Sequence, residues 1–106
     1  MRTERSIKGN LHTGFVVKTR KGELFMVVRV GNYKMHLLGR DHSYSIKMWQ
    51  TNLLAAPEYL GPEMDVMEIY GLVRASASHY GALCISTRNR PMLWKRKDGS
   101  EGTIVQ

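Results

Sequence analysis

The feature that most constrains the fold is a β-rich run from residue 15 to residue 38, which two glycine-containing breaks divide into three segments. The breaks are Lys21-Gly22 and Gly31-Asn32. Both have the residue types of tight turns, and glycine adopts the positive φ that such turns need. The sequence therefore predicts an antiparallel meander of three strands.

The second break also predicts how two of these strands face each other. If Gly31-Asn32 is a two-residue turn, Val28 lies opposite Met35 and Met26 opposite Leu37. Because strand side chains alternate between faces, one face is then wholly apolar and the other mixed. We expect four apolar residues to be buried together: Val17, Met26, Val28 and Leu37. The mixed face would pair Arg29 with Lys34, Val27 with His36 and Phe25 with Leu38.

The rest of the chain adds fewer elements. Residues 44–49 and 66–70 are predicted to be strands, and 92–96 the last strand, with Trp94 in the core or against the first hairpin. Residues 50–64 lack periodicity and contain prolines, which predicts a long surface connection. In 71–90, Ser76 or Ser78 is a candidate cap for one short helix. About five strands predict a mainly β fold, a small SH3-like or related open barrel, with a helix-covered sheet as the alternative.

The chain length predicts one domain, residues 1–106, with a loose lead-in at 1–13 and a frayed tail at 98–106. No apolar run approaches the roughly 20 residues that span a bilayer, and no secretory signal opens the sequence. The single cysteine, Cys84, has no internal disulfide partner. We therefore expect a cytoplasmic protein that does not enter a membrane.

Sites for catalysis, metals or cofactors have no support in the sequence. The four histidines and Cys84 lack metal-ligand spacing, and no glycine-rich phosphate loop is present. Asp65 and Glu68 would project from opposite faces of a strand, which argues against an acid/base pair. We expect a protein that is not an enzyme and holds no cofactor and no metal.

Positive charge is concentrated in the first half of the chain. The net charge is +7, and residues 1–50 hold ten Lys/Arg against three Asp/Glu, whereas residues 51–106 hold six of each. Such a field attracts phosphates or acidic partners, although solvated lysines with no partner explain it equally well. The candidate basic surface comprises Lys18, Arg20, Lys21, Arg29, Lys34, Arg40 and Lys47. Tyr33, Tyr44 and Trp49 place aromatic rings nearby, as in small barrels that bind single-stranded nucleic acid.

Two segments resemble known proteins. The stretches Asp-Val-Met-Glu-Ile-Tyr at 65–70 and Met-Leu-Trp-Lys-Arg-Lys at 92–97 are similar to small uncharacterised proteins of bacteriophages and prophages, chiefly of Gram-positive bacteria. Those proteins also open with a hydrophobic β-hairpin. Residues 71–85 depart from the pattern, since Tyr70-Gly71-Leu72 stands where a Tyr-Arg-Pro-like turn is common. The resemblance carries over no functional residue; it implies a phage accessory gene expressed in the host cytoplasm.

The leading hypothesis is a phage-type accessory protein that binds and inhibits a host macromolecule, such as a defence nuclease of the CRISPR type. The candidate aromatic interface anchors are Trp49, Tyr59 and Tyr80, and Arg40 is a further candidate. The alternatives are a nucleic-acid-binding module that uses the basic surface and a sponge for a phosphorylated signal. The partner is thus a host protein or a protein–nucleic-acid complex. The sequence leaves the oligomeric state open, a homodimer included.

Overall fold

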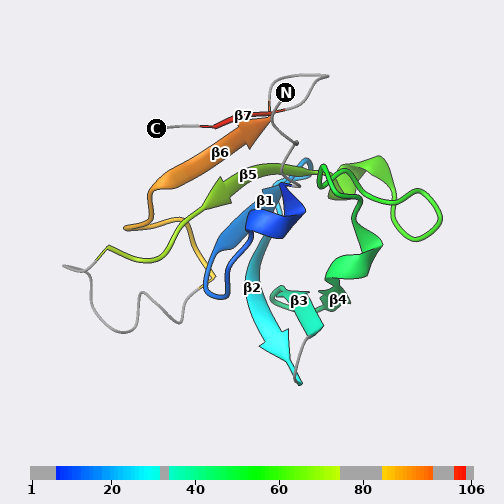
Figure 1. Cartoon of the computed structure of the whole chain (residues 1–106), viewed down its shortest axis with the longest axis horizontal. Coiled ribbons are helices and arrows are strands. Elements are labelled where there is room, and N and C mark those ends of the chain that lie inside the picture. The colour runs from blue at the N-terminus through cyan, green and yellow to red at the C-terminus, as the bar shows by residue number, and fades with distance from the viewer. Residues whose placement is uncertain (1–6, 32–33, 75–84, 97–101, 105–106) are drawn as a thin grey trace.

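A single antiparallel sheet organises the protein (Figure 1). The computed structural model of the chain describes residues 7–31, 34–74, 85–96 and 102–104. Seven strands follow the order β4-β3-β2-β1-β5-β6-β7, so the described pairings leave β4 and β7 as the two edges. Their bounds are β1 Val16–Thr19, β2 Leu24–Val30, β3 Lys34–Leu38, β4 Ser43–Ser45, β5 Val66–Tyr70, β6 Met92–Arg96 and β7 Gly102–Ile104.

The mainly β class is confirmed. Helical conformation in the described residues is limited to three 3₁₀ turns, η1 Lys8–Asn10, η2 Ile46–Met48 and η3 Pro62–Met64. The predicted strands at 66–70 and 92–96 have the predicted bounds, as β5 and β6. The candidate helix caps Ser76 and Ser78 lie outside the described residues.

The β1–β2 hairpin confirms the first predicted turn. Gly22 has φ of 92°, and the amide N–H of Gly22 donates to the Thr19 carbonyl at 2.9 Å. The N–H of Thr19 in turn donates to the Glu23 carbonyl at 2.9 Å, which closes a three-residue loop. A positive φ at the last loop residue is what this turn requires, and glycine adopts it without strain.

The predicted register of β2 and β3 is wrong by one residue. Val28 pairs with His36 and Val27 with Leu37, because three residues, 31–33, connect the strands in place of two. A shift of one residue moves every β3 side chain to the other face relative to β2. Phe25, Val27 and Leu37 are consequently buried, whereas Met26 and Val28 lie half-buried on the outer face of the sheet. Of the four residues predicted to be buried together, Val17 and Leu37 are.

One face of the sheet carries the hydrophobic core. Val17 pairs with Phe25 on one side and with Ile69 on the other, and Ile69 pairs with Trp94. These side chains share one face and are buried, and the prediction for Trp94 is confirmed. The core is completed from the segments before and between the strands by Leu11, Trp49, Leu53, Ala55 and Met64, and from the start of β5 by Val66.

Residues 44–49 do not form the single strand that the sequence predicted. Strand β4 ends at Ser45, whose Oγ accepts the N–H of Lys47 at 3.3 Å and caps η2. The 3₁₀ turn directs Trp49 into the core, where it is 1% exposed and its Nε1 donates to the Met64 carbonyl at 2.8 Å. A buried indole needs such an acceptor.

Aromatic rings pack closely beside the β3–β4 turn. Tyr44 meets Phe25 and Trp49 edge-on, with ring centroids 5.8 and 6.0 Å apart. The Phe25 ring also lies against Gly39, where an added Cβ would stand 2.6 Å from its Cε1 atom. Gly39 is therefore required by the close approach of the ring, since any side chain there would overlap the core.

Residues 50–64 were predicted to be a surface connection, but they cover the core face (Figure 1, green, to the right of the strands). The lead-in also contributes, because Leu11 is buried and the Lys8 Nζ donates to the Trp49 carbonyl at 2.7 Å. Burial lowers the pKa of the Lys8 amino group. In the predicted tail, Gly102–Ile104 pairs with β6 as β7.

The register generates a test with two neighbouring valines. We expect Val27→Ala to lower the free energy of unfolding by about 2–3 kcal/mol, because it removes buried methyl groups and leaves a cavity. Val28→Ala, on the outer face, should cost about 1 kcal/mol or less. Urea denaturation of both variants measures the difference. A larger loss of stability for Val28→Ala than for Val27→Ala would support the two-residue turn.

Candidate functional site

The seven residues of the candidate basic surface do not form one surface. Arg29 pairs with Met35 on the core side of the sheet, whereas Lys34, opposite Val30, belongs to the outer face. With the predicted two-residue turn, Arg29 and Lys34 would share the mixed face of the sheet with His36. The one-residue shift moves Arg29 to the core side, whereas Lys18, Lys34 and His36 remain on the outer face, so the predicted pairing of Arg29 with Lys34 is wrong.

Acidic partners compensate several of these charges. Arg20 pairs with Asp65, with Nη2 and Oδ2 3.2 Å apart, and Lys21 pairs with Glu23 at 3.3 Å. Lys18 lies beside Glu68 in the ladder between β1 and β5. Arg29, Lys34, Arg40 and Lys47 are exposed, but they are spread over β2, β3, the β3–β4 loop and η2.

The three aromatic candidate anchors have different outcomes. Trp49 is buried in the core and cannot contact a partner, so its assignment as an anchor is wrong. Tyr59 is 62% exposed and remains a candidate. Tyr80 lies outside the described residues.

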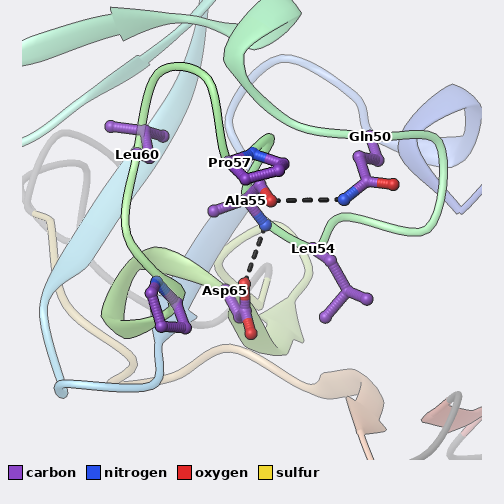
Figure 2. A pocket seen from close by; sticks show the side chains of 7 residues that line it. Gln50, Leu54, Ala55, Pro57, Leu60 and Asp65 are labelled. Atoms are coloured by element: carbon purple, nitrogen blue, oxygen red, sulfur yellow. Dashed lines mark hydrogen bonds between the residues drawn. The ribbon is translucent and has the colours of Figure 1, made fainter.

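Tyr59 belongs to a segment that also forms a pocket. The pocket has a volume of about 340 Å³. Leu54, Pro57, Leu60 and Pro62 contribute apolar atoms to its lining, and Figure 2 shows the first three of them. Gln50, Ala55 and Asp65 complete the lining. All seven residues lie in the 50–65 segment, which we call the pocket segment.

The polar groups of the pocket already bind one another (Figure 2). The Ala55 N–H donates to Asp65 Oδ1 at 2.8 Å, and the Gln50 Nε2 donates to the Ala55 carbonyl at 3.2 Å. The second oxygen of Asp65 accepts from Arg20. Because these groups are satisfied, the pocket offers a ligand mainly apolar surface.

Hydrogen bonds hold the first part of the pocket segment. The Gln50 N–H donates to the Leu54 carbonyl at 2.9 Å, and the Leu53 N–H donates to the Gln50 carbonyl at 2.8 Å. From the sheet, the buried Arg96 guanidinium donates through Nη2 to the Asn52 carbonyl at 2.7 Å. Several independent contacts therefore maintain the pocket wall at Leu54.

Leu53 has an unusual backbone conformation. Its φ is 66°, in the left-handed region, while its side chain is fully buried. This conformation costs a residue with a Cβ atom roughly 1–2 kcal/mol. Burial of the leucine side chain offsets the strain, and the turn places Leu54 on the opposite side, in the pocket wall.

Sequence reasoning missed the pocket. The apolar and proline residues of 50–64 were interpreted as a connection because they lack periodicity. The apolar residues themselves were a usable signal. Apolar side chains in an irregular segment need burial as much as those of a strand do. The role of Asp65 was also missed, since its partners are an arginine 45 positions earlier and a loop amide.

The outer face carries a hydrogen-bonded pair. The Tyr70 hydroxyl donates to Glu68 Oε1. Burial and the adjacent carboxylate raise the pKa of Tyr70 to about 12. Both side chains lie on the face that carries Lys18, since Lys18 pairs with Glu68 and Val16 with Tyr70.

Nowhere in the described parts of the chain do three His, Cys, Asp or Glu side chains gather as metal ligands would. Among those same residues, no helix has the length and apolar character to span a bilayer. Comparisons with models of protein families, with curated proteins and with solved structures found no match to the chain.

Leu53 provides a test of the strained turn. We expect Leu53→Ala and Leu53→Gly both to destabilise the fold by about 2–5 kcal/mol, because each removes a buried leucine side chain. Glycine should nevertheless be the better tolerated of the two by roughly 0.5–1 kcal/mol, since it relieves the left-handed strain. Urea denaturation of the pair measures this. An alanine variant as stable as the glycine variant would show that the turn is not strained.

Tyr70 provides a test by titration. The pKa of about 12 exceeds the ordinary value of 10.0, so the folded chain holds this proton at pH values where the unfolded chain releases it. The resulting stabilisation is complete below pH 10 and is lost as the pH rises towards 12. Glu68→Gln should lower the pKa of Tyr70, because it removes the negative charge. Phenolate absorbance measured against pH gives the pKa, and the Tyr70→Phe variant identifies which signal belongs to Tyr70. An unchanged pKa of Tyr70 in Glu68→Gln would contradict the pairing.

Proposed function

We propose that the protein is a binding module that docks on a protein partner through its pocket segment. One observation carries the proposal: a pocket with apolar walls opens on a hydrogen-bonded segment, beside an exposed tyrosine. Apolar pockets and exposed aromatic side chains are the features that supply most of the binding energy at protein interfaces. Tyr59 would lie against the partner, and a partner side chain would enter the pocket.

The hydrogen bonds within the pocket segment support the same function. A loop that must order on binding reduces affinity by its lost conformational entropy. Here the wall at Leu54 is held by the hydrogen bonds of Gln50 and Leu53 and by Arg96. The strained backbone of Leu53 is retained close to the pocket, as strain often is near binding sites.

The proposed biological context follows from the resemblance to phage accessory proteins. In that context the module works in the bacterial cytoplasm, and its partner is a host protein or a protein–nucleic-acid complex, such as a CRISPR-type defence nuclease. The open antiparallel sheet with one covered face fits the small-barrel scaffold, SH3-like or related, that was predicted.

The alternatives are less well supported. Nucleic-acid binding needs basic groups along one path, and the described basic residues are dispersed or paired with carboxylates. A sponge for a phosphorylated signal needs donors in a pocket, whereas this lining contains a carboxylate and no basic residue.

Two exposed apolar side chains give the test a matched control. Tyr59 and Leu72 are 62% and 58% exposed, and only Tyr59 lies in the pocket segment. The immobilised wild-type protein, Tyr59→Ala and Leu72→Ala are each incubated with bacterial lysate, with and without nuclease treatment. We expect the wild-type protein to capture a protein partner whether or not the lysate is treated with nuclease. The captured amount should be unchanged for Leu72→Ala and should fall about tenfold or more for Tyr59→Ala, as for an interface hot spot.

Three results would contradict the proposal. One is capture that disappears with nuclease, which would favour the nucleic-acid alternative. Another is capture that is equally strong for Tyr59→Ala. The last is an equal loss for both variants, which would show that the pocket segment has no special role. Gel shifts of DNA and RNA at low and physiological salt complete the comparison, because phosphate contacts weaken steeply with salt.

A further inference from the structure

The pocket segment differs in charge from the rest of the chain. Between Lys47 and Arg74 there is no basic residue, and there are four carboxylates: Glu58, Glu63, Asp65 and Glu68. The whole chain has a net charge of +7. The pocket therefore lies in the one long acidic stretch of a basic protein.

Two of these four carboxylates have partners within the fold. Asp65 pairs with Arg20 and accepts the Ala55 N–H, so its charge is compensated inside the pocket wall. Glu68 is on the outer face, where it accepts from Tyr70. Neither is available to a ligand at the pocket mouth.

The other two, Glu58 and Glu63, follow Pro57 and Pro62 of the pocket lining in the sequence. Both are exposed, and neither forms an ion pair with a described residue. Glu58 lies between Pro57 and Tyr59, and Glu63 follows Pro62 with its carboxylate packed over Gly61.

Basic residues that contact the pocket segment or the residue before it include Lys8, whose amino group donates to the Trp49 carbonyl, and Arg20 and Lys21 of the β1–β2 turn. The backbone N–H of Lys21 donates to the Glu63 carbonyl at 3.1 Å, but the Lys21 amino group pairs with Glu23. Arg20 is paired with Asp65. The negative charges of Glu58 and Glu63 thus remain for a binding partner.

Building on the proposed function, we propose that the pocket recognises a protein segment in which a bulky apolar side chain is flanked by Lys or Arg. The apolar side chain would fill the space between Leu54, Pro57 and Leu60. The adjacent cation would lie against Glu58 or Glu63. A volume of about 340 Å³ suits one large side chain. Exposed ion pairs contribute modestly to affinity, and they contribute more to selectivity and to the rate of association.

Short peptides test this inference directly. The probes are Ac-Gly-Lys-Trp-Lys-Gly-NH₂, its counterpart with Glu in place of Lys, and Ac-Gly-Lys-Gly-Lys-Gly-NH₂, which lacks the apolar side chain. Each is titrated to millimolar concentration into ¹⁵N-labelled protein at low salt, and the amide resonances of residues 50–65 are followed. We expect the Lys-Trp-Lys peptide to bind there about two- to fivefold more tightly than the Glu-Trp-Glu peptide, the range of an exposed ion pair. Non-specific attraction to a chain of net charge +7 would give the opposite order.

Charge variants locate the effect. Glu58→Gln combined with Glu63→Gln should abolish the preference for the basic peptide. Glu68→Gln removes a carboxylate away from the pocket and should leave the preference unchanged. The peptide without tryptophan should not shift the amide resonances of the pocket segment, because it has no apolar side chain to fill the pocket.

The possible failures are distinguishable. Equal binding of the two tryptophan peptides, or preference for the acidic one, would overturn the inference about charge and leave the apolar pocket intact. Loss of the preference in Glu68→Gln would also overturn it. If neither tryptophan peptide shifts the resonances of residues 50–65, the pocket is not a binding site, and the proposed function fails as well.

Discussion

The structure depends on the hydrogen bonds that allow an irregular segment to cover the core. Residues 46–65 contain no strand, yet they bury Trp49, Leu53 and Met64 against the sheet. Backbone carbonyls buried in this way need donors. Arg96 donates to the carbonyls of Val66 and Asn52 at 2.9 and 2.7 Å, and Trp49 donates to Met64. The guanidinium of Arg96 also lies 4.8 Å from the centre of the Trp94 ring, so its charge is kept beside an aromatic face.

Local patterns were sufficient to predict several elements, and long-range contacts decided the rest. The turn at Gly22 and strands β5 and β6 follow from local sequence, and the structure has them as predicted. The register of β2 and β3 depends on whether the turn contains two or three residues, which Gly31-Asn32 does not determine. The burial of Trp49 and the pairing of Arg20 with Asp65 join residues far apart in the chain, and no periodicity reveals them.

The same one-residue difference changed the functional interpretation. With the predicted register, Arg29 and Lys34 would share a face and suggest a surface for phosphates. With the observed register they are on opposite faces, and the pocket lies instead in the acidic, apolar segment between β4 and β5. Predicting a surface from the side chains of paired strands therefore requires the correct register, because the register decides which side chains share a face.

The contact between Phe25 and Gly39 links two positions that are distant in sequence. An added Cβ at Gly39 would overlap the Phe25 ring, and that ring is fully buried beside Tyr44. Neither position can therefore change freely without the other. Among diverging descendants of this chain, a side chain at position 39 should coincide with a smaller residue at position 25. The two positions would then covary, and their covariation would identify this turn and core in aligned sequences.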